Sequence, residues 1–148
     1  MKIMKILLIN GPNMGRLGKR EPGIYGTRTL AAIVADLRKM AAARQVELVD
    51  FQSDIEGELV RRIGTAQEEG FAGIIINPGA YTHTSVAVRD ALSGACVPAI
   101  EVHLSNISDR EDFRKVLITT PACRGMICGM GEKGYALALT AFCDGSVK

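Results

Sequence analysis

Residues 73–79 have the sequence GIIINPG, an unbroken apolar run that ends in an Asn-Pro-Gly turn signal. Such a run, bounded by turn residues, is typical of a β-strand buried on both faces. Residues 6–9 (ILLI) repeat the pattern and stop at another turn signal, Asn-Gly-Pro, at residues 10–12. Strands of this kind belong to parallel sheets covered by helices on both sides. The pattern therefore predicts a parallel sheet.

Strand and helix patterns alternate along the chain. We expect strands at residues 6–9, 46–51, 73–77, 99–103 and 125–128. We expect helices over residues 30–41 with Thr29 as N-cap, from a Ser53–Glu56 capping box to Gly70, over residues 85–94, from a second capping box at Ser108–Glu111 through Phe113 and Arg114, and over residues 134–143. The alternation predicts one α/β domain spanning residues 1–148, a flavodoxin-like doubly wound fold whose five-stranded parallel sheet has the order 2-1-3-4-5.

The composition is that of an ordinary globular domain, with 148 residues, 47% hydrophobic, 23% charged and a net charge of +2. This balance gives no electrostatic reason to expect nucleic acid. The chain has no tryptophan, four phenylalanines and three tyrosines. These are few aromatic side chains on which bases or flavins could stack. No apolar run approaches the length of a membrane span, and the run after Lys5 is too short for a signal peptide. We expect no membrane segment.

The cysteines do not form a metal-binding pattern. Cys96, Cys123, Cys128 and Cys143 contain no C-x-x-C pair, and the chain has two histidines, so a structural zinc site is not expected. We predict that all four are reduced and mostly buried, in a reducing, cytoplasmic compartment. The sequence leaves open whether Cys123 and Cys128 lie close together.

The expected ligand site is the edge where the parallel strands end, near the topological switch point. Polar residues follow the strands at 6–9, 73–77 and 99–103, which are neighbours in the predicted order: Asn10, Asn13, Asn77, His83, His103, Ser105 and Asn106. Both histidines of the chain fall on this edge, which favours a functional site there.

Glu101 and His103 are two residues apart on one predicted strand, so their side chains face the same side. A carboxylate in this position can hold the imidazole in one tautomer and favour its protonated form. An ion pair without catalytic use is an equally open interpretation.

A glycine-rich loop at residues 15–26 (GRLGKREPGIYG) is the second candidate. Four glycines suit a mobile lid over an active site. A neighbouring arginine stabilises the phenolate form of a tyrosine, so Arg20 beside Tyr25 would create a general base. The alternative is a solvated basic loop.

Two further patterns do not indicate a site. The glycines at residues 129–134 match G-x-G-x-x-G, but only 14 residues remain, too few for a dinucleotide-binding unit, so we expect a tight strand-to-helix turn. Asp109, Glu111 and Asp112 are better explained by the first turn of a helix, where acids complement the dipole, than by a metal site.

Six sequence blocks resemble the signatures of the type II 3-dehydroquinate dehydratase family. They are NGPN at 10–13, LGKREP at 17–22, IYG at 24–26, NPGAYTHTS at 77–85, EVHLSN at 101–106 followed by Arg110 and Arg114, and GxGxxGY at 129–135. The blocks occur in family order and cover nearly the whole chain. Met14, where the family usually has leucine, and a cysteine-rich last third depart from the family pattern.

The resemblance implies a flavodoxin-like fold and the dehydration of 3-dehydroquinate to 3-dehydroshikimate in the shikimate or quinate pathway, without metal or cofactor. It implies that Tyr25 removes a proton from C2 of the substrate, with Arg20 holding Tyr25 as phenolate. Asn77 would hold a water that stabilises the enolate. His103 would protonate the leaving hydroxyl.

The resemblance also implies supporting and binding residues. Glu101 would support His103, and Asn13 would help orient it. The substrate carboxylate would bind the backbone around Leu104 and Ser105. The resemblance implies that His83 and Arg114 bind ring hydroxyls of the substrate. It also implies that Asp90 is the residue through which a neighbouring subunit reaches the site. It implies a homo-oligomer in which trimers assemble into dodecamers.

A non-catalytic, flavodoxin-like small-molecule binding module is the alternative from another class. A phosphoacceptor domain would need acids after the first strand, where Asn10 stands, and no Asp or Glu precedes Glu21. A flavin carrier would need hydroxyls in the loop at residues 11–15, which has no Ser or Thr. A Schiff-base dehydratase would need a lysine at a strand end, and none is present there.

Overall fold

The computed structural model describes residues 2–148, which contain a five-stranded sheet of order β2-β1-β3-β4-β5. The strands are β1 (Met4–Asn10), β2 (Val46–Gln52), β3 (Gly73–Asn77), β4 (Ala99–His103) and β5 (Gly125–Cys128). Every neighbouring pair is parallel. The predicted fold class and strand order are confirmed, with β3, β4 and β5 at the predicted bounds.

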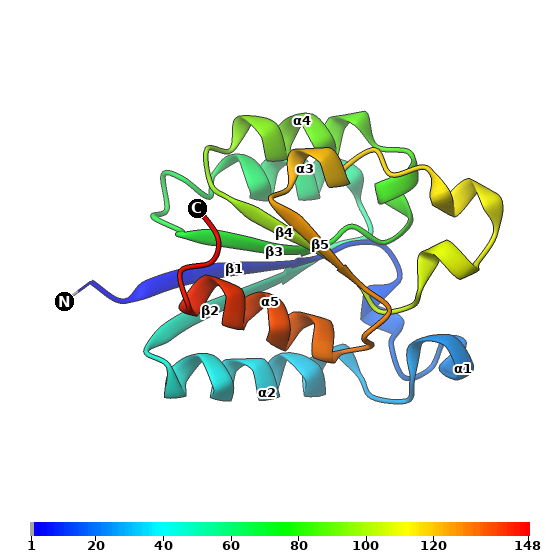
Figure 1. Ribbon diagram of the computed structural model, residues 1–148, viewed down its shortest axis with the longest axis horizontal. Coiled ribbons are helices and arrows are strands. Elements are labelled where there is room, and N and C mark those ends of the chain that lie inside the picture. Colours follow the sequence, from blue (N-terminus) through cyan, green and yellow to red (C-terminus); the bar gives the residue numbers. More distant parts are fainter. Residues whose placement is uncertain (1) are drawn as a thin grey trace.

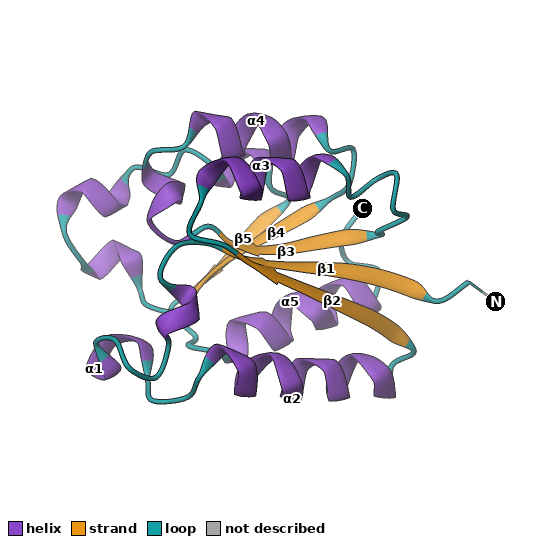
Figure 2. Cartoon of the chain, turned by 180° about the vertical axis from the view of Figure 1, so that it is seen from behind, coloured by secondary structure: helices purple, strands orange, loops and turns teal. Residues whose placement is uncertain are grey.

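Helices cover both faces of the sheet (Figures 1 and 2). One face carries α2 (Leu30–Ala43) and α5 (Lys133–Cys143), and the other carries α3 (Glu56–Gly64) and α4 (Val86–Gly94). A short helix, α1 (Pro22–Tyr25), lies beyond the carboxyl ends of the strands.

Alternate residues of each strand feed two separate hydrophobic cores, because successive side chains point to opposite faces. Ile6 and Leu8 of β1 belong to the core on the α2–α5 side. Leu7 and Ile9 belong to the core on the α3–α4 side. All four are fully buried, so β1 is buried on both faces, as its unbroken apolar run predicted.

Side-chain caps fix the start of two helices. The Thr29 hydroxyl accepts a hydrogen bond from the Ala32 amide at 3.2 Å and starts α2, as predicted. The Ser85 hydroxyl accepts from the Val88 amide at 2.9 Å and starts α4. Each cap satisfies an amide that has no partner within its helix.

The first predicted capping box is wrong. The Ser53 hydroxyl accepts from the Ile55 amide at 3.0 Å and donates to Glu58 at 2.5 Å, so the Ser53–Glu56 pair does not form. The helix α3 also ends at Gly64, whereas we expected Gly70. Glycine is a poor helix residue, and residues 65–70 form turns that lead into β3.

The second predicted capping box is also wrong. Two 3₁₀ turns, η3 (Ile107–Asp109) and η4 (Asp112–Lys115), replace the expected helix. The Asn106 side chain accepts from the Ser108 amide at 3.3 Å and so takes the capping position ahead of Ser108. Of the acidic residues, Glu111 pairs with Arg114 at 2.5 Å and Asp112 with Lys115 at 3.1 Å. Asp109 and Asp112 lie in the first turns of η3 and η4, so the predicted first-turn position of these two acids is confirmed for 3₁₀ turns instead of one helix.

The glycine-rich segment at residues 129–134 forms the predicted tight turn from β5 into α5. Gly129 and Gly131 have φ of 84° and 58°, in the left-handed region that favours glycine.

A close backbone approach joins the loops after β1 and β3. The Gly11 amide donates to the Asn77 carbonyl at 2.8 Å. A Cβ atom at position 11 would lie 2.5 Å from the Pro78 carbonyl oxygen, so this approach requires glycine. It holds the ends of two central strands side by side.

The four cysteines are free, as predicted, but they are not mostly buried: Cys96 is exposed and the other three are half-buried. Cys96 lies in the short connection between α4 and β4, with φ of 55°. Residues 2–148 include no helix long and apolar enough to cross a membrane.

Candidate active site

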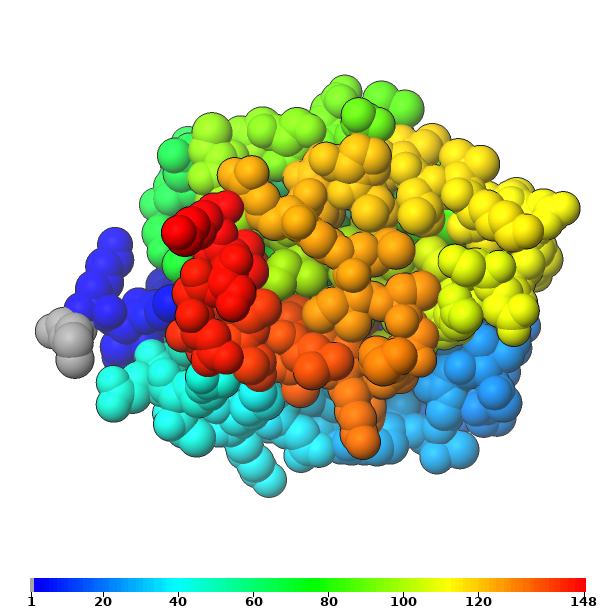
Figure 3. Space-filling model, viewed as in Figure 1, coloured from blue at the N-terminus to red at the C-terminus, as the bar shows by residue number. Residues whose placement is uncertain are grey.

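A cavity opens where β1, β3 and β4 end, at the predicted switch point. In Figure 3 the segment after β4 (yellow) and the segment around α1 (light blue) border each other at this end of the molecule. The predicted site residues that line the cavity are Asn13, Arg20, Tyr25, Asn77, His83, His103, Leu104, Ser105 and Arg114.

Asn77 is held by a directional hydrogen-bond chain. Its side-chain oxygen accepts from the Gly79 amide at 3.0 Å. Its side-chain nitrogen therefore faces Tyr135 and donates to that hydroxyl at 3.1 Å. Tyr135 in turn donates to the side-chain oxygen of Asn10 at 2.5 Å. The backbone amide of Gly79 thus fixes which way the Asn77 amide is turned.

Tyr135 links α5 to the carboxyl ends of β1 and β3. The side chain is completely buried, and burial raises the pKa of its phenol well above the usual range. The phenol is therefore protonated and always has a proton to donate to Asn10. The remaining buried nitrogen of Asn10 has no hydrogen-bond partner within residues 2–148.

His103 and Glu101 form the predicted pair, with His103 Nε2 at 2.8 Å from Glu101 Oε2. Burial by itself raises the pKa of Glu101, but hydrogen bonds from His103, Thr119 and Thr120 hold it below its usual value. An ionised carboxylate accepts hydrogen bonds only, so Nε2 of His103 carries a proton. This leaves Nδ1 as the imidazole nitrogen available to a ligand. Glu101 itself lies behind His103 and does not line the cavity.

His83 has the opposite tautomer. Its Nδ1 lies 2.7 Å from the Val116 carbonyl oxygen, which can only accept, so Nδ1 carries the proton. Burial lowers the pKa of His83 below the ordinary histidine value, and the charge of Arg114 acts in the same direction. A neutral His83 presents Nε2 as a hydrogen-bond acceptor, which suits a ligand hydroxyl.

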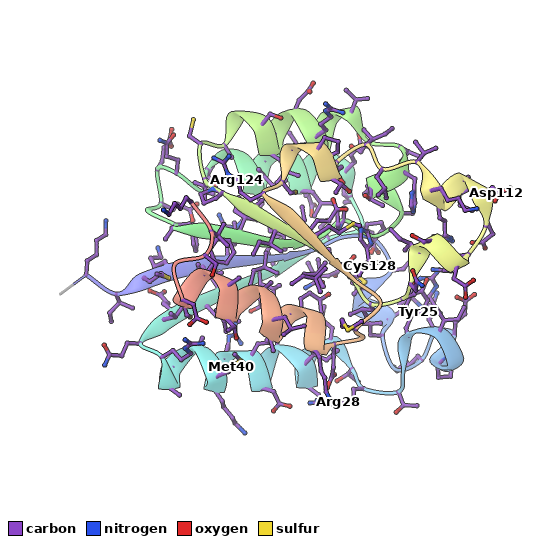
Figure 4. All side chains as sticks on the ribbon, in the orientation of Figure 1. Tyr25, Arg28, Met40, Asp112, Arg124 and Cys128 are labelled. Atoms are coloured by element: carbon purple, nitrogen blue, oxygen red, sulfur yellow. The ribbon has the colours of Figure 1, made fainter. Side chains whose placement is uncertain are left out.

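Tyr25, labelled in Figure 4, lines the cavity together with Arg20 and Arg110. Arg110 donates from Nη1 to the Tyr25 hydroxyl at 2.8 Å. The Arg20 guanidinium lies 5.2 Å from the centre of the Tyr25 ring, so it faces the ring. Sequence reasoning paired Tyr25 with Arg20 and did not single out Arg110. The position of Arg110, shortly after the EVHLSN block, was the available signal.

The other predicted residues occupy different positions. Asn13 has φ of 67° at the end of the loop after β1. Its backbone amide donates to the Asp54 carboxylate at 2.9 Å. Arg114 lines the cavity while its Nε donates to Glu111 at 2.5 Å. Asp90 is exposed on α4 and does not line the cavity of this chain. Ser105 receives a hydrogen bond from Arg110 at 3.3 Å.

Comparison with known proteins gives a consistent match over nearly the whole chain. The family model described as "Dehydroquinase class II" matches residues 4–143. The chain is 56% identical over 137 residues to the 3-dehydroquinate dehydratase of Thioalkalivibrio sulfidiphilus, covering 93% of each chain. It is 49% identical over 138 residues to the enzyme of that name from Clostridium beijerinckii, covering 93% of this chain and 94% of the other.

Solved structures agree with the sequence comparison. The type II dehydroquinase of Butyrivibrio crossotus superposes with a TM-score of 0.92 at 44% identity, covering 95% of this chain and 97% of that one. A 3-dehydroquinate dehydratase-like protein from Bifidobacterium longum gives a TM-score of 0.71 at 28% identity, covering 95% and 96%.

Removing the Tyr135 hydroxyl by Tyr135→Phe should lower the free energy of unfolding by about 1–3 kcal/mol, because it leaves buried groups of Asn77 and Asn10 without partners. Urea denaturation followed by circular dichroism measures the loss. The matched control is Tyr81→Phe, whose hydroxyl donates to the Asp54 carbonyl near the surface, and whose cost should stay under about 1 kcal/mol. Equal costs for the two variants would contradict the buried chain.

Proposed function

The chain belongs to the class II dehydroquinase family, and from that premise we propose which residues carry out its reaction. The protein dehydrates 3-dehydroquinate, a step of the shikimate pathway; a non-catalytic binding module is not favoured. Loss of water from this β-hydroxy ketone forms a C1–C2 double bond conjugated to the ketone, giving 3-dehydroshikimate. The observation that carries the mechanism is that Tyr25, Asn77 and His103 line one cavity.

Tyr25 is the general base in this proposal and removes a proton from C2, next to the ketone. The hydrogen bond from Arg110 supports this role, because a cation that donates to the phenol oxygen stabilises the phenolate. Arg20, over the ring, adds a second positive charge. The electron pair of the broken C–H bond moves into the ketone and forms an enolate.

Asn77 supports the enolate through a water molecule. The side-chain nitrogen of Asn77 carries two protons, and Tyr135 takes one of them. The other points toward the Met14 sulfur at 3.6 Å, a weak acceptor, so a water bound beside it can accept this proton instead and donate to the enolate oxygen. The fixed orientation of the Asn77 amide supports this role, because a donor held in place needs no reorganisation during the reaction.

His103 is the general acid and protonates the leaving C1 hydroxyl, which departs as water while the enolate collapses to the C1–C2 double bond. The proton leaves from Nδ1, because Nε2 donates to Glu101. Glu101 supports the imidazolium before the transfer and fixes the tautomer after it. Asn13 helps to orient this group. Every proton removed or delivered passes between the substrate, protein side chains and water.

The remaining polar residues orient the substrate. The backbone around Leu104 and Ser105 binds the carboxylate, since these residues follow His103 and line the same cavity. His83 accepts from a ring hydroxyl through Nε2, and Arg114 binds another. Four free thiols support a reducing, cytoplasmic location for the enzyme.

The chain forms a single catalytic domain spanning residues 1–148 in this proposal. Its cavity is closed by the loop 15–26 and by a residue of a neighbouring subunit. The loop 15–26 acts as a mobile lid, since Arg20 and Tyr25 on it line the cavity. Asp90 reaches the cavity of a neighbouring subunit in a trimer, and trimers assemble into a dodecamer. Exposed Val86, one helical turn before Asp90, supports burial of this part of α4 between copies.

Sedimentation equilibrium tests the assembly. We expect a mass of twelve chains, and a monomer would contradict the assembly.

Limited trypsin digestion tests the lid. We expect cleavage after Lys19 or Arg20 that slows when product is bound. Cleavage at the same rate with and without product would contradict the lid.

The near-ultraviolet absorbance of the conjugated product tests the base. Tyr25→Phe should lower kcat by roughly 10²–10⁴-fold with KM little changed, because the ring contacts remain and the proton acceptor is lost. Tyr81→Phe is the matched control and should retain wild-type kcat. Near-wild-type turnover by Tyr25→Phe would place the base elsewhere, and no turnover by the folded wild type would contradict the activity itself.

A further inference from the structure

Glu101 is surrounded by hydroxyl groups from two segments outside its own strand. The carboxylate has no exposed surface. Thr119 lies 2.5 Å from Oε1, and Thr120 lies 2.5 Å from Oε2. Thr82, from the 3₁₀ turn η2 (Gly79–His83), lies 3.1 Å from Oε2. With His103 on Oε2, donors from three parts of the chain meet one buried anion.

Each of these hydroxyls donates to the carboxylate. Thr119 has one hydroxyl proton and two acceptors in reach, Glu101 at 2.5 Å and Thr82 at 2.9 Å. The carboxylate is nearer and charged, so it takes the proton. Thr120 has the Met126 sulfur as its other acceptor at 3.9 Å, which is longer and weaker.

The same short segment also contacts the second histidine. Residues 116–120, which we call the 116–120 segment, run from the end of η4 into the first residue of η5 (Thr120–Ala122). The Val116 carbonyl accepts from His83. The Ile118 amide donates to the Thr82 carbonyl at 2.7 Å, which fastens the segment to η2. The position of one segment therefore sets the surroundings of both histidines in the cavity.

We propose that Thr119 and Thr120 are positioning residues for the general acid: their hydroxyls hold the Glu101 carboxylate in the ionised form and orientation that keep the proton of His103 on Nε2 and turn Nδ1 to the substrate. The inference rests on the proposed role of His103. It adds residues that occur in none of the sequence blocks shared with the family.

The physical reason is the cost of a buried anion. When His103 gives its proton to the leaving hydroxyl, Glu101 loses its cationic partner and remains a buried carboxylate. Such a group is costly unless several hydrogen bonds satisfy it. The threonine hydroxyls remain as donors after the transfer, so they stabilise the state that the acid step produces. If Glu101 instead held the proton, Glu101 and His103 would both be neutral, and the carboxylate charge that stabilises the imidazolium would be lost.

The other titratable groups facing Glu101 do not replace the threonines. His83, on η2, is neutral because burial lowers its pKa. Cys123, after η5, is also neutral, because burial and the Glu101 charge raise the pKa of its thiol to about 12. Its thiol contacts the Thr119 carbonyl at 3.8 Å. The donors that can satisfy Glu101 are thus His103 and the hydroxyls.

The test uses Thr119→Val and Thr120→Val, which are nearly isosteric and remove only the hydroxyl. We expect kcat to fall roughly tenfold in each, with KM within about twofold, since each variant removes one hydrogen bond to a charged group. The acid limb of the kcat profile should move to higher pH, because losing a donor raises the pKa of Glu101. Thr119→Ser and Thr120→Ser should restore both.

A second measurement reports the tautomer without activity. The chain has two histidines, so nitrogen-15 NMR of the imidazoles resolves each, and His83→Asn assigns them. Wild type should show an Nε2-bound proton on His103, and the valine variants a mixture of tautomers. Thr140→Val is the matched control, since this half-buried hydroxyl donates to the Ala136 carbonyl at 2.9 Å within α5.

Each outcome decides the proposal. Valine variants that keep the Nε2 proton, the pH profile and kcat would overturn it. If Thr119→Val does not fold, the partly exposed Thr120 gives the decisive variant. A wild type with the Nε2-bound proton and no turnover would remove the proposed function and leave the positioning intact, whereas an active wild type without that proton would overturn the positioning alone.

Discussion

The site depends on one constraint, which is that a carboxylate is buried in the middle of a parallel sheet. Glu101 lies on β4 with no exposed surface, and an unpaired charge in that place would cost several kcal/mol. The chain satisfies it with His103 from the same strand, Thr82 from η2, and Thr119 and Thr120 from the segment before β5. One anion thereby fixes the relative positions of three elements at the carboxyl edge of the sheet.

The two sides of the cavity have opposite electrostatic character. Around His103 the charge is the buried carboxylate of Glu101, 2.8 Å from Nε2. Around Tyr25 the charges are the guanidinium groups of Arg20 and Arg110. An acid and a base can coexist at one pH in a single cavity when their surroundings stabilise opposite charges. The geometry thus supports removal of a proton on one side and delivery on the other.

Local sequence patterns predicted the features that depend on neighbours in the chain. The apolar runs located β1 and β3, and the two-residue spacing placed Glu101 and His103 together. The glycines at 129–134 predicted a turn. The identity of the substrate was predicted from the sequence blocks that resemble the family, because composition and spacing cannot specify it.

Contacts between distant residues could not be predicted in the same way. Arg110 is 85 residues from Tyr25, and sequence reasoning chose the nearer Arg20. Thr119 and Thr120 lie 18 and 19 residues from Glu101 and belong to no motif, so only the folded chain brings them to the carboxylate. Both capping boxes failed for a related reason, because the serine amide that should donate to the glutamate of each box already has a partner. The Ser53 amide donates to the Asn10 carbonyl, and the Ser108 amide donates to the Asn106 side chain.

Hydrogen exchange at C2 of the substrate tests whether the base and the acid are separate groups. His103→Asn is incubated with 3-dehydroquinate in deuterium oxide, and the recovered substrate is examined by NMR. We expect deuterium at C2 with little product, because in the proposed mechanism Tyr25 still forms the enolate while the hydroxyl cannot leave. Absence of deuterium, or equal incorporation when Tyr25→Phe is added to the same variant, would contradict it.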